Sequence, residues 1–142
     1  MVLEDAITEM SAYGVAIGMT VDRIEGAKLT VRVPYAPHLV GDPDTGVIHG
    51  GVITAALDNA SGWAVRVGKD SQDDMGMATL DLRIDYMKPA TPHIDLFVTA
   101  ECYKQTSTIS FVRASAFHEH AEDPVATSVA AFMMGTPNAP RS

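Results

Sequence analysis

The sequence predicts an α+β fold in which a curved antiparallel β-sheet of five or six strands wraps around one central helix. Three observations carry this prediction. One apolar stretch with helical spacing runs from about Gly51 to Val67. Four later runs alternate between apolar and polar residues with the period of two that a half-buried strand requires. Short turn sequences separate these runs, and the helices are too few to cross between parallel strands.

The first third of the chain predicts a helix, a hairpin and a loop. Apolar residues at helical spacing indicate a short amphipathic helix over residues 3–13. Strand-like patterns follow over residues 15–22 and 28–33, with Glu25 and Gly26 between them, and predict a β-hairpin. Residues 34–49 contain several prolines and glycines and predict an irregular loop, which is long enough to suggest a functional role.

The central helix follows a His49-Gly50-Gly51 turn and carries one carboxylate, Asp58. A helix that is apolar on most sides is a buried helix, and small residues around the carboxylate leave space for a ligand. Adjacent glycines permit a sharp turn and a close approach to backbone amides, where the helix dipole adds positive charge. The turn therefore predicts a pocket for a carbonyl or an anion.

Four alternating runs make up the second half of the predicted sheet. Their inward-facing positions are expected at residues 78–86 (even numbers), 94–102 (even numbers), 109 and 111, and within 125–134. The run from Met77 to Met87 is the expected edge strand, and pairing with a second copy of the chain would cover it. The same alternation puts Thr79 on the polar face with Asp81 and Arg83. Only a β-bulge or a position at the subunit seam would bring Thr79 into a site.

Length and composition argue against several classes of protein. With 142 residues, the chain is expected to form one domain over residues 1–142, with a flexible tail from about residue 136. A net charge of −8 without a cluster of basic residues argues against nucleic-acid binding. No apolar run is long enough to span a membrane, and the N-terminus does not resemble a signal peptide, so a cytoplasmic location is expected.

The cysteine and histidine residues predict neither a disulfide nor a metal site. Cys102 is the single cysteine, and its place in an alternating run favours a packed thiol over a nucleophile. His118 and His120 lie near two glutamates, but a solvated strand end is the simpler interpretation. We expect no metal and no other cofactor.

Two segments carry a family resemblance. They are GVIHGGVITAALDN at residues 46–59 and ATLDLRIDYMKPA at residues 78–90. With these motifs, the chain resembles the hotdog-fold acyl-CoA thioesterases of the PaaI-like family, and the likeness extends from the first hairpin through Met134. The resemblance implies a homodimer, often paired into a homotetramer, with two sites at the subunit interface and an acyl-CoA as substrate.

The resemblance also implies roles for individual residues. The Gly51 amide would polarise the thioester carbonyl, and Asp58 of the other subunit would act as nucleophile or as general base. Thr79 would orient the water, and His49 would mainly fix the turn. The residues expected to bind substrate are His49, Gly50, Asp42 and Asn59. Many relatives have an asparagine before the glycine pair, and here Asp42 or Asp44 is the nearest counterpart.

Thioester hydrolysis requires little machinery because a thiolate is a good leaving group. One polarised carbonyl, one carboxylate and one water suffice, and the sequence supplies the protein groups for this set. Two alternatives remain. Asp44 before His49 is compatible with a hotdog enoyl- or hydroxyacyl-thioester hydratase-dehydratase. A non-catalytic acyl-CoA binding domain would retain the pocket without turnover. The sequence does not identify the acyl group.

Overall fold

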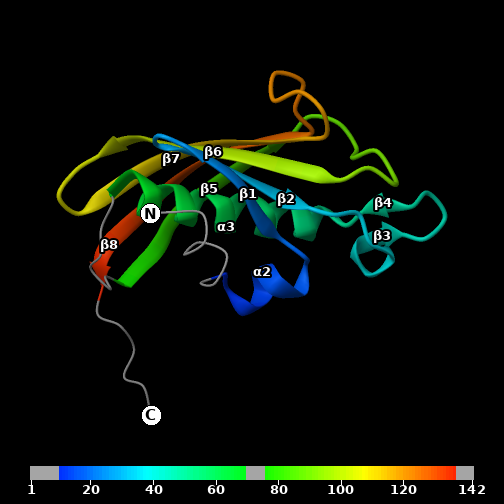
Figure 1. Cartoon of the computed structure of the whole chain (residues 1–142), viewed down its shortest axis with the longest axis horizontal. Coiled ribbons are helices and arrows are strands. Elements are labelled where there is room, and N and C mark those ends of the chain that lie inside the picture. Colours follow the sequence, from blue (N-terminus) through cyan, green and yellow to red (C-terminus); the bar gives the residue numbers. More distant parts are fainter. Residues whose placement is uncertain (1–9, 70–75, 137–142) are drawn as a thin grey trace, which may run out of the picture.

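The computed structural model describes residues 10–69 and 76–136. In this part of the chain, an antiparallel sheet of six strands in the order β1-β2-β6-β7-β8-β5 arches over one long helix, α3 (Figure 1). The predicted α+β arrangement is confirmed, at the upper end of the expected strand number. The predicted loop over residues 69–74 and the predicted tail lie almost wholly outside the described residues.

The bounds of the elements are as follows. The main sheet contains β1 (Thr20–Glu25), β2 (Lys28–Val33), β5 (Gly76–Tyr86), β6 (Leu96–Gln105), β7 (Ile109–Phe117) and β8 (Ala126–Thr136). The helices are α2 (Ala12–Ala16), the 3-10 helix η1 (Pro37–Leu39) and α3 (Gly50–Lys69). A separate small hairpin contains β3 (Val40–Asp42) and β4 (Val47–Ile48).

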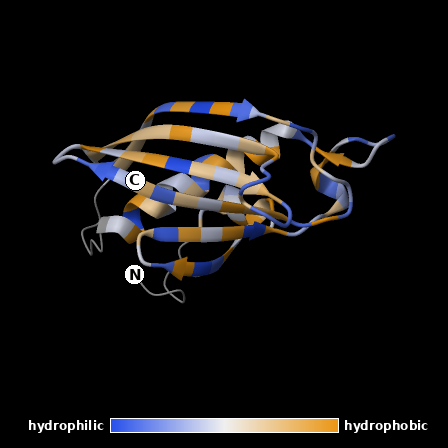
Figure 2. Cartoon of the chain, turned by 90° about the horizontal axis from the view of Figure 1, so that it is seen from above, coloured by the Kyte–Doolittle hydropathy of each residue, from blue (hydrophilic) through white to orange (hydrophobic). Residues whose placement is uncertain are grey.

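Helix α3 is buried because its apolar face lies against β2, β6 and β7. Leu57, Ala60 and Ala64 of this face have no exposed surface. Alternate residues of the strands face them, and the resulting banding of apolar and polar positions is visible in Figure 2. Full burial of a leucine or valine side chain contributes about 1.5–3 kcal/mol, so this interface is a main source of stability.

The N-terminal region differs from the prediction. Residues 3–9 of the predicted helix lie outside the described residues, and the short helix α2 begins only at Ala12, after the Ser11 side chain caps it. The predicted strand is wrong over residues 15–19. Gly18 has a φ of 77°, and the Met19 amide donates to the carbonyl of Gly14 at 2.8 Å. This pattern is a Schellman helix end, so strand β1 starts later than predicted.

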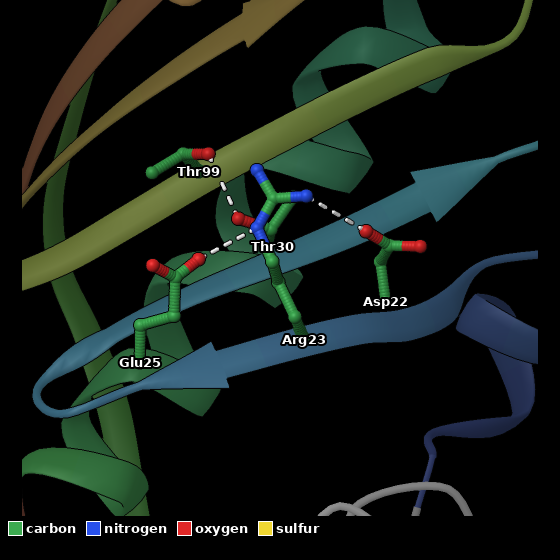
Figure 3. Close-up of polar contacts among 5 residues, drawn as sticks. All are labelled: Asp22, Arg23, Glu25, Thr30 and Thr99. Atoms are coloured by element: carbon green, nitrogen blue, oxygen red, sulfur yellow. Dashed lines mark hydrogen bonds and ion pairs between the residues drawn. The ribbon is translucent and has the colours of Figure 1, made fainter.

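Strand β1 forms one edge of the sheet and carries charged side chains. The predicted hairpin with β2 is confirmed, with Glu25 opposite Lys28. Arg23 donates to Glu25 at 2.7 Å and to Asp22 at 3.1 Å (Figure 3). Charges along an edge oppose pairing with a further strand.

Strand β5 forms the other edge, as predicted, but contains a β-bulge. Thr79 pairs with Phe132 and Asp81 pairs with Ala131, so Leu80 is the extra residue. Residues before the bulge are therefore shifted by one position relative to simple alternation. The prediction that Leu80 faces inward is wrong, since the side chain is 50% exposed. The prediction that Thr79 shares a face with Asp81 is wrong for the same reason.

Strand β7 also presents a face that the sequence did not predict. Ser110 and Val112 point into the core and have no exposed surface, whereas the predicted inward residues Ile109 and Phe111 lie on the opposite face. The Ser110 hydroxyl donates to the sulfur of Met134 at 2.9 Å and accepts from Gln105. These partners make burial of a polar residue tolerable.

Candidate active site

The start of α3 is a turn formed by His49, Gly50 and Gly51, which we name the glycine turn. The His49 amide donates to the Leu39 carbonyl at 2.9 Å, which ties the turn to η1. The Gly51 amide donates to Nδ1 of His49 at 2.8 Å. A Cβ atom at residue 51 would lie 2.9 Å from that nitrogen, so only glycine leaves room for the ring. In this chain, the His49 ring therefore occupies the amide expected to polarise a carbonyl.

Tyr86 holds the glycine turn from the side of β5. Its hydroxyl donates to the Gly50 carbonyl at 2.8 Å and lies 2.5 Å from the hydroxyl of Thr54. Because the Tyr86 proton is used on Gly50, Thr54 is the donor of the second bond. Sequence reasoning missed both residues. The position of Tyr86 within the second motif was the available signal.

Asp58 lies two turns further along α3 and is half-buried. The hydroxyl of Thr79 donates to Oδ1 of Asp58 at 3.2 Å. The β5 bulge makes this contact possible, because it turns Thr79 toward the helix. Two residues predicted for the site are thus brought together within one chain.

A cavity of about 200 Å³ opens beside this pair. The side chain of Asn59, a predicted substrate-binding residue, lies at the cavity and is held there. Its amide donates to the Ala55 carbonyl at 2.8 Å, and its oxygen accepts from Ser11 at 3.0 Å. The cavity is lined by Ser11, Asp58, Asn59, Gly62, Trp63, Arg66, Met77, Thr79 and Phe132.

The glycine turn and Asp58 do not meet within one chain. Asp58 lies seven positions after Gly51, which corresponds to about 10 Å along the helix axis. Asp42, also predicted to bind substrate, lies in the β3–β4 hairpin and is exposed. Its carboxylate accepts the Asp44 amide at 3.0 Å, so Asp42 closes a local turn there.

A polar network supports the loop that leads into the glycine turn. Asp95 accepts from the Tyr35 amide at 2.9 Å and from Arg32 at 2.5 Å. The Tyr35 amide and, next, Arg32 lower the pKa of Asp95 below its usual value. The Tyr35 hydroxyl donates to the Gly46 carbonyl at 2.6 Å. The network therefore connects the main sheet to the hairpin beside the turn.

His118 belongs to the same region and is not the solvated residue that the sequence predicted. Its ring is half-buried and bridges two backbone groups. Nε2 accepts the Thr91 amide at 2.9 Å, so Nδ1 carries the proton and donates to the Asp95 carbonyl, also at 2.9 Å. Within the described residues, no three His, Cys, Asp or Glu side chains gather as a metal site would require.

A comparison with known families identifies the chain. The model described as thioesterase superfamily matches residues 45–125, a span that includes the glycine turn, Asp58 and Thr79. The chain belongs to the thioesterase superfamily. No helix among the described residues has the length and apolar character needed to cross a membrane.

Curated relatives of this thioesterase-superfamily chain agree with that assignment. A candidate esterase of Halobacterium salinarum is 30% identical over 100 residues, which span 70% of this chain and 65% of that relative's length. The medium/long-chain acyl-CoA thioesterase YigI of Salmonella typhimurium is 29% identical over 132 residues, covering 84% of this chain and 83% of YigI.

Solved structures confirm the hotdog fold that the resemblance implied. A crystal structure of a Pseudomonas aeruginosa protein has a TM-score of 0.81 and 40% identity, covering 92% of this chain and 97% of that one. A thioesterase of Haemophilus influenzae has a TM-score of 0.82 and covers 94% of this chain and 90% of that chain. At 16% identity, the second likeness concerns the fold alone.

Proposed function

We propose that this chain is an acyl-CoA thioesterase in which the glycine turn of one subunit and Asp58 of another act on the same thioester. As a member of the thioesterase superfamily, the chain is a thioester hydrolase. The YigI relatives, named for acyl-CoA substrates, support the substrate class. The observation that carries the proposal is the carboxylate of Asp58, hydrogen-bonded to Thr79 at 3.2 Å beside a cavity.

In the proposed reaction, backbone and side-chain groups divide the work. The Gly51 amide, at the positive end of α3, stabilises the oxyanion that develops on the carbonyl. This requires the His49 ring to yield the hydrogen bond it now accepts from that amide. Asp58 either attacks the carbonyl carbon itself or takes the proton of a water that attacks it. Either route breaks the carbon–sulfur bond and releases CoA as a thiolate, and in the first route a water then hydrolyses the acyl–Asp58 anhydride to the free acid.

The distance along α3 supports a site shared between subunits. Reacting groups have to approach within about 3–3.5 Å, whereas the glycine turn and Asp58 of one helix are about 10 Å apart along its axis. We propose a homodimer that pairs along β5, and a homotetramer formed from two such dimers. On edge β5, Leu80 and Tyr86 are 50% and 52% exposed, and Met87, directly after the strand, is 58% exposed, whereas edge β1 carries ion pairs.

Mixed dimers test the shared site directly. Gly51→Ala and Asp58→Asn subunits are prepared separately, then unfolded and refolded together in equal amounts. If the site is shared, a mixed dimer has one intact site, and about a quarter of wild-type activity returns, because half of the dimers are mixed. A site within one chain would give no recovery.

Substrate hydrolysis tests the activity. Wild type and Asp58→Asn are assayed with short, medium, long and aromatic acyl-CoAs and a thiol reagent. We expect wild-type turnover and a loss of about 10²–10⁴-fold in the variant. Absence of turnover on every substrate would refute the proposal. Tight binding without product would instead indicate a binding domain, and loss of the enoyl absorbance of crotonyl-CoA would indicate a hydratase.

The hydratase alternative receives less support than the thioesterase from the residues that the structure brings together. The residue that suggested it, Asp44, lies in the β3–β4 turn and does not line the cavity. A cytoplasmic location stays a proposal that rests on the sequence, and fractionation of cells that express the chain tests it.

A further inference from the structure

Gly62 leaves an open space on α3 about one turn beyond Asp58. It lines the cavity and is half-buried, in a helix whose other inward positions carry side chains. A Cβ atom at residue 62 would lie 3.4 Å from the terminal methyl of Met77 and 3.9 Å from the ring of Phe132. These are ordinary contact distances, so no clash requires glycine at this position. The absence of a side chain instead adds volume to the cavity.

The cavity walls near Gly62 are apolar. Trp63 and Phe132 are 5% and 3% exposed and present rings, and Met77 presents a flexible thioether. The Arg66 guanidinium lies over the Trp63 ring, 5.2 Å from its centre. The polar lining residues are Ser11, Asp58, Asn59, Arg66 and Thr79, and the apolar part of the surface beside them suits the hydrocarbon part of a substrate.

The volume limits what this surface can accommodate. An apolar cavity of about 150 Å³ holds a benzene molecule, whereas pockets for drug-sized ligands occupy about 300–1,000 Å³. At about 200 Å³, the cavity lies just above the first value. It therefore fits an acyl group of about six to eight carbons, linear or aromatic.

We propose that Gly62 determines the size of the acyl group, and that preferred substrates carry an apolar acyl group of about six to eight carbons. This inference rests on the proposed thioesterase function and assigns a specificity role to a residue that takes no part in the chemistry. A side chain at residue 62 fills the space between Asp58 and Phe132, and larger acyl groups then no longer reach the carboxylate in a reactive position.

Substitution of Gly62 with a matched control tests this role. Wild type, Gly62→Ala, Gly62→Leu and Gly68→Ala are assayed with acetyl-, hexanoyl-, octanoyl-, phenylacetyl- and palmitoyl-CoA. Gly68 lies on the same helix, but a Cβ there would contact Cys102 at 3.5 Å, outside the cavity. Both alanine variants thus replace a glycine of α3, and only Gly62→Ala adds a side chain at the cavity.

The expected result is a change in selectivity. In wild type, kcat/KM rises from acetyl- to octanoyl-CoA. In Gly62→Leu, the ratio of octanoyl to acetyl kcat/KM falls by at least about tenfold, since even one misplaced methylene in an apolar pocket changes kcat/KM by that much. Gly62→Ala gives a smaller fall in the same direction, and Gly68→Ala leaves the ratio unchanged.

Other results would overturn the inference in recognisable ways. A wild type that prefers acetyl-CoA contradicts the assigned size. An equal loss on all substrates in both Gly62 variants, with unchanged melting temperatures, contradicts the selective role. If wild type hydrolyses nothing, the proposed function fails, and calorimetry with acetyl- and octanoyl-CoA still tests Gly62: equal effects of Gly62→Leu on the two affinities would then refute it.

Discussion

The start and the middle of helix α3 are built in opposite ways. At the start, Gly50 and Gly51 are held by hydrogen bonds from Tyr86 and to His49, and a Cβ atom on Gly51 has no space. In the middle, Asp58 accepts a hydrogen bond from Thr79 and faces a cavity. The start is therefore fixed by close backbone contacts, whereas the middle leaves space for water and an acyl group.

This difference suggests a division of tasks along one helix. Stabilising an oxyanion requires donors that are already in position before charge develops. A nucleophile or general base requires access to water and substrate as well as correct orientation. Substitutions that disturb one region and not the other separate these tasks.

Among substitutions that leave the Asp58 carboxylate in place, the largest effect is expected from a side chain at the start of α3. Gly51→Ala places a Cβ 2.9 Å from His49 Nδ1, so the ring has to move and the turn loses its geometry. We expect kcat/KM to fall about 10²-fold, as for removal of an oxyanion donor. Gly50→Ala is the control, because the nearest atom to its Cβ is the Tyr86 hydroxyl at 3.8 Å. Equal losses in the two variants would contradict the assignment.

A smaller effect is expected in the middle of the helix. Thr79→Val removes the hydroxyl that donates to Asp58 but keeps the shape of the side chain. Since one hydrogen bond to a charged group contributes about 1.5 kcal/mol or more, kcat should fall about tenfold. Thr79→Ser keeps the donor and should retain most activity. If Val and Ser behave alike in steady-state kinetics, Thr79 does not position Asp58.

Loss of the Tyr86 hydroxyl should mainly affect stability. Tyr86→Phe removes hydrogen bonds to Gly50 and from Thr54, and the free energy of unfolding in urea should fall by about 1 kcal/mol. Thr54→Val disturbs the same cluster. The double variant should therefore lose less than the sum of the single losses, and strict additivity would show that the two hydroxyls act independently.

The smallest effect is expected behind the glycine turn and depends on pH. The pKa of Asp95 is lowered in the folded state, so its contribution to stability is present above the unfolded value of about 3.9 and is lost as the pH falls through the folded pKa. Asp95→Asn should lower the melting temperature slightly at pH 7, because the ion pair with Arg32 is partly exposed. The difference in melting temperature between Asp95→Asn and wild type should shrink below about pH 4. A difference that stays constant with pH would show that the Asp95 charge does not stabilise the fold.

The sequence predicted the central helix and the antiparallel sheet because both depend on periodicity. The predicted helix, residues 51–67, matches α3 (Gly50–Lys69) to within two residues at each end. Its apolar positions are spaced for one buried face, and no competing pattern exists there. The alternating runs likewise became β5, β6, β7 and β8.

Predictions from alternation were wrong where one extra residue shifts a strand's inward and outward positions, or where a distant residue provides a hydrogen-bond partner. The extra residue Leu80 reverses the faces of the first part of β5, and no local pattern marks a bulge. Ser110 points into the core because Met134 and Gln105 provide partners from other parts of the chain. The contacts of Tyr86 with Gly50 and Thr54 also join distant residues. The periodicity of a sequence reflects residues that are close along the chain, and it does not indicate contacts between distant residues.

The bulge in β5 shows that the face on which a strand residue lies matters as much as its residue type. Thr79 reaches Asp58 because Leu80 is left out of the pairing with β8, so that Thr79 takes the inward position next to Asp81. Deleting Leu80 would remove the bulge but leave Thr79 and Met77 facing the helix, because Thr79 already pairs as though it directly preceded Asp81. An edge strand can thus absorb one extra residue as a bulge and still keep the residues on both sides of it in register with the neighbouring strand.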